Sequence, residues 1–115
     1  MFSYSGYKIY LACGATDMRK AINGLCDIVQ NEFNLDPRDK IIFASCNRQR
    51  NRLKLLVWED NGFLLHFKRI ERGTMSWPQK DNSNPTMVLT LDDIKNIIKA
   101  PGIRQKIRRN EVWKN

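Results

Sequence analysis

The stretch from residue 47 to residue 78 constrains the fold of this chain more than any other. It joins an arginine-rich turn to an apolar run, a short turn at Asp60-Asn61-Gly62, a second apolar run and another basic turn. Apolar runs bounded by Asn, Asp and Gly predict strands, and a short turn with Asn-Gly between two such runs predicts a β-hairpin. We therefore expect two antiparallel strands, over residues 53–59 and 63–70.

The length of the hairpin loop determines which side chains share a face. A two-residue loop at Asn61-Gly62 would pair Asp60 with Phe63 and mix apolar and polar side chains on both faces. A three-residue loop with Gly62 in the left-handed conformation would pair Glu59 with Phe63. We predict the second register, because it gathers six apolar side chains on one core-facing side: Leu53, Leu55, Val57, Phe63, Leu65 and Phe67.

The predicted register leaves a half-basic second face. Lys54 would lie directly opposite Lys68, and a like-charge pair of this kind destabilises a sheet unless an anion shields it. One hypothesis is that nucleic-acid phosphate meets the basic end of this face. The alternative is that a helix covers its apolar members, Leu56, Trp58 and Leu64, while the two lysines extend into water.

The chain as a whole predicts an α+β domain over residues 1–100 and a basic C-terminal tail over residues 101–115. Strands are expected over residues 8–12 and 41–46, and the second of these should join the hairpin in a meander. Residues 74–77 are a candidate edge strand ended by Pro78, and residues 87–89 are too short to assign. We expect a small antiparallel β-meander of three to five strands packed against two α-helices.

Periodic apolar residues and capping residues predict the two helices. Thr16 or Asp17 could cap the first, whose apolar side chains recur at helical spacing from Met18 to Phe33. The second should begin at Thr90, where a hydroxyl can cap the helix and two carboxylates follow at the positive end of its dipole.

The charge of the chain indicates the kind of partner. Its 115 residues suffice for one domain, and 20 Lys and Arg against 12 Asp and Glu give a net charge of +8. Such an excess predicts an acidic polymer as partner. No apolar run approaches the roughly 20 residues that a membrane span needs, and the first residues do not resemble a signal peptide, so we expect a cytoplasmic protein.

Catalysis and metal binding find little support in the sequence. Cys13, Cys26 and Cys46 lie far apart, and only His66 could complete a metal site, so buried reduced thiols are expected and no metal or other cofactor is predicted. Most acidic residues occupy positions typical of caps, turns and helix surfaces, and Gly-rich phosphate loops and nucleophile motifs are missing. We expect a non-enzymatic protein.

Two segments are candidates for contact with phosphate. Residues 47–52 present three arginines and three amide side chains, which suit phosphate, guanine and adenine edges, although a solvated turn has the same composition. Residues 14–20 turn from a strand into a helix, where free backbone N–H groups attract anions. Arg19 and Lys20 would lie at the positive end of that helix dipole, which is unfavourable for cations unless an anion is bound there. Asp17 could, however, already satisfy the backbone donors.

Four segments form a long ordered pattern: LACGATDMRKAINGL, NLDP, CNRQRNRLKLLVWEDNGF and FKRIERGTMSWP, over roughly residues 7–100. The pattern resembles the Orf2 (TnpB) family of accessory proteins from IS66 insertion sequences. The chain departs from it at Gln49 and Asn51, where the family prefers a basic and an acidic residue. The resemblance implies a bacterial mobile element and a role in transposition beside a separate, larger transposase, and it implies no known catalytic act.

We therefore predict an accessory protein that binds DNA, at element ends or on duplex in general, and assists a transposase. The expected nucleic-acid-binding residues are Arg48, Arg50, Arg52, Lys54, Lys68, Arg69, Arg72, Arg19 and Lys20. The alternative is a protein-docking module without DNA contact, in which exposed aromatics such as Trp77 or Trp113 engage the transposase or a second copy of this chain. A third reading is RNA binding through Trp58 on an open sheet face.

Overall fold

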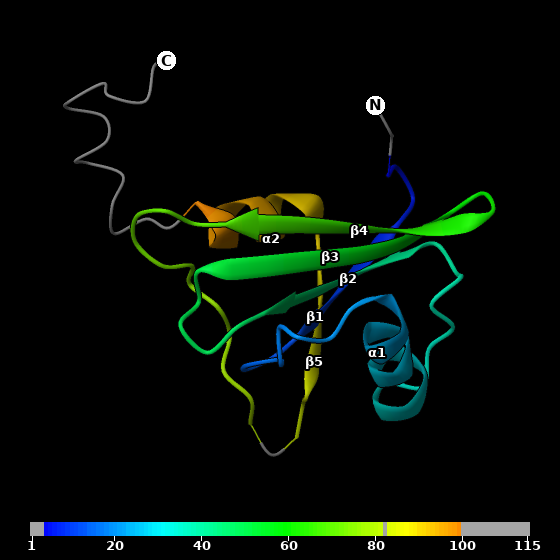
Figure 1. The fold of residues 1–115 in the computed structure, drawn as a ribbon, viewed down its shortest axis with the longest axis horizontal. Coiled ribbons are helices and arrows are strands. Elements are labelled where there is room, and N and C mark those ends of the chain that lie inside the picture. Colours follow the sequence, from blue (N-terminus) through cyan, green and yellow to red (C-terminus); the bar gives the residue numbers. More distant parts are fainter. Residues whose placement is uncertain (1–3, 82, 100–115) are drawn as a thin grey trace.

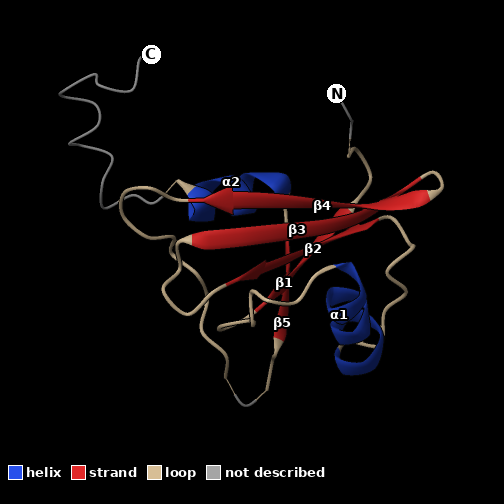
Figure 2. Ribbon diagram, in the orientation of Figure 1, coloured by secondary structure: helices blue, strands red, loops and turns tan. Residues whose placement is uncertain are grey.

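The computed structural model describes residues 4–81 and 83–99, which form a five-stranded sheet with a helical segment on each face (Figures 1 and 2). The spatial order of the strands is β4-β3-β2-β1-β5. Along the chain the elements are β1 (Lys8–Ala12), α1 (Ile22–Asp27), the π-helical turn η1 (Ile28–Glu32), β2 (Ile41–Cys46), β3 (Arg52–Glu59), β4 (Gly62–Arg69), β5 (Thr86–Leu89) and α2 (Leu91–Ile98). The expected α+β class, with a β-meander and two helices, is confirmed. The predicted tail, residues 101–115, lies outside the described residues.

The sheet is mixed, because β1 runs parallel to β2. A parallel pair needs a long crossover connection, and α1 with η1 lies within the one between these strands. β2, β3 and β4 form the expected antiparallel meander, and β5 returns to pair antiparallel with β1 on the other side. β1 and β2 therefore end side by side at the same end of the sheet, so the loops that follow Ala12 and Cys46 lie together.

Alternating side chains along the strands build a core on each face. On the α2 side the core includes Leu11, Ile42, Val57 and Ile94. On the α1 side Leu25 and Val29 pack against Phe43 and Leu56, among others. Each fully buried side chain of this kind contributes about 1.5–3 kcal/mol relative to an exposed one. Because a helix covers each face of the sheet, both sides of β2 are covered and the strand is buried along its whole length.

The first helix is shorter than its apolar periodicity predicts. Regular helix begins at Ile22 and not near Met18, because the Asp17 carboxylate accepts the backbone N–H of Arg19 in a separate turn. After Asp27 the chain widens into η1, and Asn34 closes it with a left-handed φ of 56°. The second helix starts as expected, with Thr90 and Asp93 in a capping box.

The hairpin register differs from the predicted one. Glu59 pairs with Gly62 across a two-residue turn, in which Asp60 has a φ of 54°. Val57 consequently lies opposite Leu64 and Leu55 opposite His66, so the apolar residues of the two strands do not share one face. The prediction of a single apolar face was wrong because it assumed that one side of the hairpin is solvated, whereas the α1-side and α2-side cores cover both.

The register also corrects the expected pair of lysines. Lys54 lies opposite Phe67 and Lys68 opposite Leu53, so the two lysines are on different faces of the sheet. A like-charge pair does exist, but it joins Arg52 to Arg69 at the end of the hairpin far from its turn.

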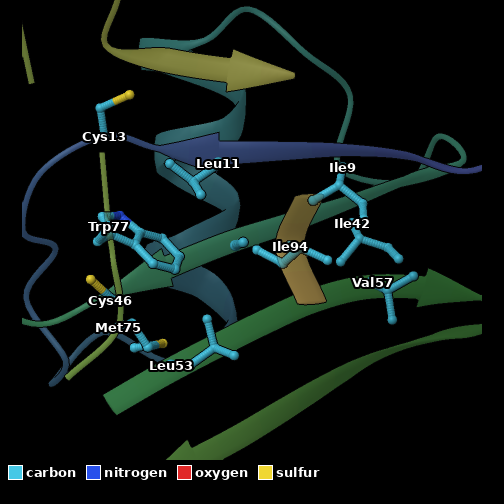
Figure 3. Close-up of a cluster of buried hydrophobic side chains, with 11 residues drawn as sticks. Ile9, Leu11, Cys13, Ile42, Cys46, Leu53, Val57, Met75, Trp77 and Ile94 are labelled. Carbon is cyan, nitrogen blue, oxygen red and sulfur yellow. The ribbon is translucent and has the colours of Figure 1, made fainter. Parts of the chain in front are cut away.

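Residues 74–77 are not a strand, contrary to the sequence-based expectation. They belong to an irregular segment that carries Met75 and Trp77 into the core at one end of the sheet, beside Cys13 and Cys46 (Figure 3). The indole Nε1 of Trp77 donates to the carbonyl oxygen of Ala12 at 2.9 Å. Burial and hydrogen bonding, and not sheet pairing, hold this segment in place. The fourth and fifth strands of the sheet are β1 and β5.

Candidate nucleic-acid interface

Residues 47–52, the basic turn, connect β2 to β3 around one buried amide. The Oδ1 atom of Asn47 accepts the backbone N–H groups of Asn51 and Arg52, at 3.0 and 2.9 Å. Its Nδ2 group donates to the side-chain oxygens of Gln49 and Asn51. The amide side chains for which we expected contact with adenine edges therefore hold the turn together, and they leave the arginines as its outward-facing groups.

Arg48 and Arg50 are exposed on the basic turn. Arg50 has a left-handed φ of 60°, a conformation that costs a non-glycine residue about 1–2 kcal/mol. Its carbonyl oxygen accepts the backbone N–H of Met75 at 2.8 Å. The buried Met75 thus fixes the backbone at Arg50 and makes the basic turn a rigid support for its guanidinium groups.

The open end of the β3–β4 hairpin lies at the same end of the sheet as the basic turn (Figure 1), and the pair Arg52 and Arg69 stands there. The backbone N–H of Ile70 donates to the carbonyl oxygen of Asn51 at 2.7 Å, which ties the end of β4 to the turn. Arg52 is half-buried, and the exposed Arg69 donates to the Glu71 carboxylate at 2.7 Å. Arg72 is exposed on the next turn along the chain. Four of the expected arginines are therefore brought together: Arg48, Arg50, Arg52 and Arg69.

Lys54 performs a structural task that its sequence position does not reveal. Its Nζ atom donates to the carbonyl oxygens of Met18 and Lys20, at 2.8 and 2.7 Å. These bonds anchor the loop before α1 to β3. Lys68 is exposed on the opposite face of the sheet, at the rim of an apolar groove beside α2. The two lysines therefore do not form one patch.

The loop before α1 has little free backbone to offer an anion. Gly14 donates to the carbonyl oxygen of Pro78, Thr16 to that of Cys46 and Lys20 to that of Asp17. The Asp17 carboxylate accepts the Arg19 guanidinium, at 2.7 Å, and this pairing holds the pKa of Asp17 well below its usual range. Arg19 is thus engaged by a carboxylate at an exposed site, while Lys20 is exposed beside it.

The structure adds one cation that sequence reasoning missed. Lys80 lines a hollow of about 280 Å³ together with Arg48, Arg50, Gln79, Gly14 and Trp77, which we call the basic hollow. It lies where β1 and β2 end. Lys80 stands in a polar loop with no pattern of its own, and only the tertiary fold places it beside residues some 30 positions earlier in the chain.

The cysteines are protonated side chains of the core and its margin. Burial raises the pKa of the Cys46 thiol to about 12, although the Arg50 guanidinium opposes that shift, and burial also raises the pKa of Cys13 and Cys26. Within residues 4–81 and 83–99 no cluster of three His, Cys, Asp or Glu residues is arranged to hold a metal ion. The same residues contain no helix long and apolar enough to cross a membrane.

Of the two aromatic residues named in the docking alternative, the structure places only Trp77. Trp77 is only 4% exposed, so it cannot serve as an exposed docking residue, and Trp113 lies outside the described residues. Trp58 is half-buried and packs edge-on against Phe63, with ring centroids 4.9 Å apart. The large apolar side chains that are exposed include Phe67, Val88 and Leu91.

Comparisons with known proteins give a consistent match. A family model described as IS66 Orf2 like protein matches residues 7–108. Two uncharacterized proteins of Sinorhizobium fredii (strain NBRC 101917 / NGR234), y4hO and y4jC, are 32% and 30% identical to this chain over 74 and 73 residues. Each match covers 64% of this chain, and it spans 64% of y4hO and 62% of y4jC. No solved structure matches the chain.

Proposed function

The chain belongs to the IS66 Orf2-like family, whose members are accessory proteins of insertion sequences, and we propose that it binds DNA through its basic turn while assisting a separate transposase. The observation that carries this proposal is the convergence of Arg48, Arg50, Arg52 and Arg69 at one end of the sheet. Guanidinium groups are suited to bidentate contact with phosphate. A net charge of +8 adds a long-range attraction toward a polyanion.

The basic turn is ordered before it meets a partner, which favours direct contact with DNA. Asn47 and Met75 hold its backbone from inside, so binding need not order the turn first. Pre-ordered contacts lose less conformational entropy when they bind. Such a turn would position the protein on the sugar-phosphate backbone, whichever sequence is read.

The proposed role is non-catalytic. The family is not a known catalytic family, and the cations of the site are arranged for charge contact. The buried cysteines, with raised pKa values, are poor nucleophiles at neutral pH. Magnesium-dependent cleavage of DNA by the purified protein, abolished by one acidic substitution, would contradict this part of the proposal.

A binding titration tests the proposal. The labelled probes are a duplex with the element's terminal sequence, a duplex of random sequence and a single strand, each at two salt concentrations. We expect an affinity for duplex that falls steeply with salt, since each phosphate contact releases counterions. Weak, salt-insensitive binding, together with a complex that forms when the transposase is added, would instead indicate a protein-docking module. Preference for the single strand would favour RNA or unpaired DNA as the partner.

The docking alternative has its own structural support. An apolar groove of about 380 Å³ lies between α2 and the hairpin, and the exposed Leu91 is at its rim. Exposed apolar surface of this kind is typical of protein contact sites. In that case the partner would be the transposase subunit, and substitution of Leu91 by Ser would weaken that complex without affecting DNA binding.

A further inference from the structure

The basic hollow gathers three cations from two segments that are far apart in sequence. Arg48 and Arg50 come from the basic turn, and Lys80 comes from the irregular segment after β4. None of the described residues that line the hollow is acidic. The neighbouring carboxylate, Asp81, does not line it, because its Oδ1 atom accepts bonds from Ser83 and Asn84. The described wall of the hollow thus contains no carboxylate, although Lys80 also lines a neighbouring hollow with Asp17 and Glu32.

The position of Lys80 is fixed by tertiary contacts on both sides. Gly14 has a φ of 74°, and a Cβ atom there would lie 3.2 Å from the Cβ atom of Lys80. The backbone N–H of Gly14 also donates to the carbonyl oxygen of Pro78 at 2.8 Å. A side chain at residue 14 would therefore force the Lys80 segment to move by a few tenths of an ångström away from the end of β1.

A second set of contacts fixes the same segment to the basic turn. Met75 donates its backbone N–H to the carbonyl oxygen of Arg50, and Trp77 donates its indole N–H to the carbonyl oxygen of Ala12. Both side chains are buried, with exposed fractions of 1% and 4%. The hollow is thus a built feature of the fold, closed by the core, and its polar rim faces solvent.

We propose that the basic hollow is a phosphate-binding site in which Lys80 acts together with Arg48 and Arg50. In open α/β sheets, ligand sites commonly lie just beyond the carboxyl ends of the parallel strands. The hollow has this location, since the parallel strands β1 and β2 both end at it. Planar guanidinium groups would grip two oxygens of one phosphate, and the ammonium group would supply a third, less directional contact. No covalent step is involved.

The proposal rests on the proposed DNA-binding function and makes it more specific. The phosphate group could belong to a nucleic-acid backbone or to a free phosphate or nucleotide, and the chemistry of the wall is the same for both. The proposed ligand is the phosphate group itself, and the probes below distinguish its two sources. Lys80 is the residue that distinguishes this hollow from the arginine surface of the hairpin base, because it belongs to neither the basic turn nor β4.

The test compares Lys80→Gln with Lys40→Gln in the full chain. Lys40 is exposed next to the start of β2, at the opposite end of the sheet, and serves as a matched control for net charge. The first probe is duplex DNA, titrated at several salt concentrations. The second is inorganic phosphate, whose binding is followed by NMR through the backbone amide signals of Gly14 and Ala15. For duplex, we expect Lys80→Gln to weaken binding about 5–10-fold at 0.1 M salt and to lower the salt slope by about 0.9, as the loss of one phosphate contact requires. Lys40→Gln should change neither.

The outcomes separate the two proposals. If the wild-type protein binds duplex and Lys80→Gln behaves like Lys40→Gln, the hollow is not a phosphate site and DNA binding stands on the other arginines. If duplex binding is absent but inorganic phosphate shifts the Gly14 and Ala15 signals in the wild type and not in Lys80→Gln, the hollow is supported and the DNA-binding function is wrong. If neither probe binds, both proposals are overturned.

Discussion

Replacing Lys54 by Met should destabilise the protein strongly, although sequence reasoning assigned this residue to the DNA surface. The substitution keeps the length of the aliphatic stem and removes the ammonium group. That group donates to the carbonyl oxygens of Met18 and Lys20, at 2.8 and 2.7 Å. The loop before α1 would then lose its attachment to β3.

The magnitude follows from the two hydrogen bonds and their exposure. Hydrogen bonds to charged groups contribute about 1.5–3 kcal/mol each. The Met18 carbonyl bond is half-buried and the Lys20 bond is exposed, so water can replace part of the second. We therefore expect a loss of about 2 kcal/mol in the free energy of unfolding, which is within the range for one such bond, because water can largely replace the exposed one. For a domain of this size that corresponds to a fall in Tm of about 8–16 °C.

Chemical denaturation followed by tryptophan fluorescence measures the effect. The matched control is Lys68→Met, since Lys68 is an exposed lysine on the neighbouring strand β4. Surface substitutions of this kind usually change stability by less than about 0.5 kcal/mol. Equal denaturation midpoints for the two variants would refute the structural role of Lys54 and return it to the candidate binding residues.

Three further predictions concern the walls of the site. Asn47→Ala should cost about 2 kcal/mol in the free energy of unfolding, because it leaves the N–H groups of Asn51 and Arg52 without their acceptor. Asn47→Asp, which keeps the acceptor oxygen, should lose clearly less, and equal losses in urea denaturation would contradict the capping role. Gly14→Ala should cost about 1–2 kcal/mol through its positive φ, with a further cost from the contact with Lys80. Gly6→Ala, at a similarly positive φ of 84° but with open space around the added methyl group, is the control, and similar Tm values for the two would refute the close approach. The Cys46 thiol should resist thiol reagents at pH 8 until the protein unfolds, because its folded pKa is raised to about 12. A folded pKa raised above the unfolded value favours the neutral form, so stability from this group is present below the ordinary pKa of 9.0 and is lost as pH rises toward 12. Rapid labelling of Cys46 in the folded protein, located by mass spectrometry, would contradict it.

The sequence predicted well those elements whose signals are local. The strand over residues 8–12, the helix start capped by Thr90 and the meander from β2 to β4 all follow from turn residues, caps and apolar runs. The hairpin register was missed because it depends on which faces are covered. Once α1 and α2 cover both sides of the sheet, a mixed pattern is stable, and Asp60-Asn61 can form the tight turn instead of Asn61-Gly62.

The candidate site was predictable only where its signals are local in the sequence. Arg48 and Arg50 were identified from the density of charge in one turn, which the structure keeps exposed. The roles of Lys54 and Lys80 depend on partners 34 and about 30 residues away, and no local pattern reveals contacts at that distance. The docking alternative took Trp77 as an exposed residue, but its indole N–H donates to the carbonyl oxygen of Ala12, 65 residues earlier, inside the core.

The salt dependence of duplex binding by an Arg48→Gln, Arg50→Gln double variant tests the central claim most directly. Both side chains are exposed, and the capping bonds of Asn47 go to neither, so the variant should unfold at nearly the wild-type temperature. If the two arginines each neutralise one phosphate, the slope of log affinity against log salt should become shallower by about 1.8. A folded double variant with the wild-type slope and affinity would show that the basic turn does not contact DNA.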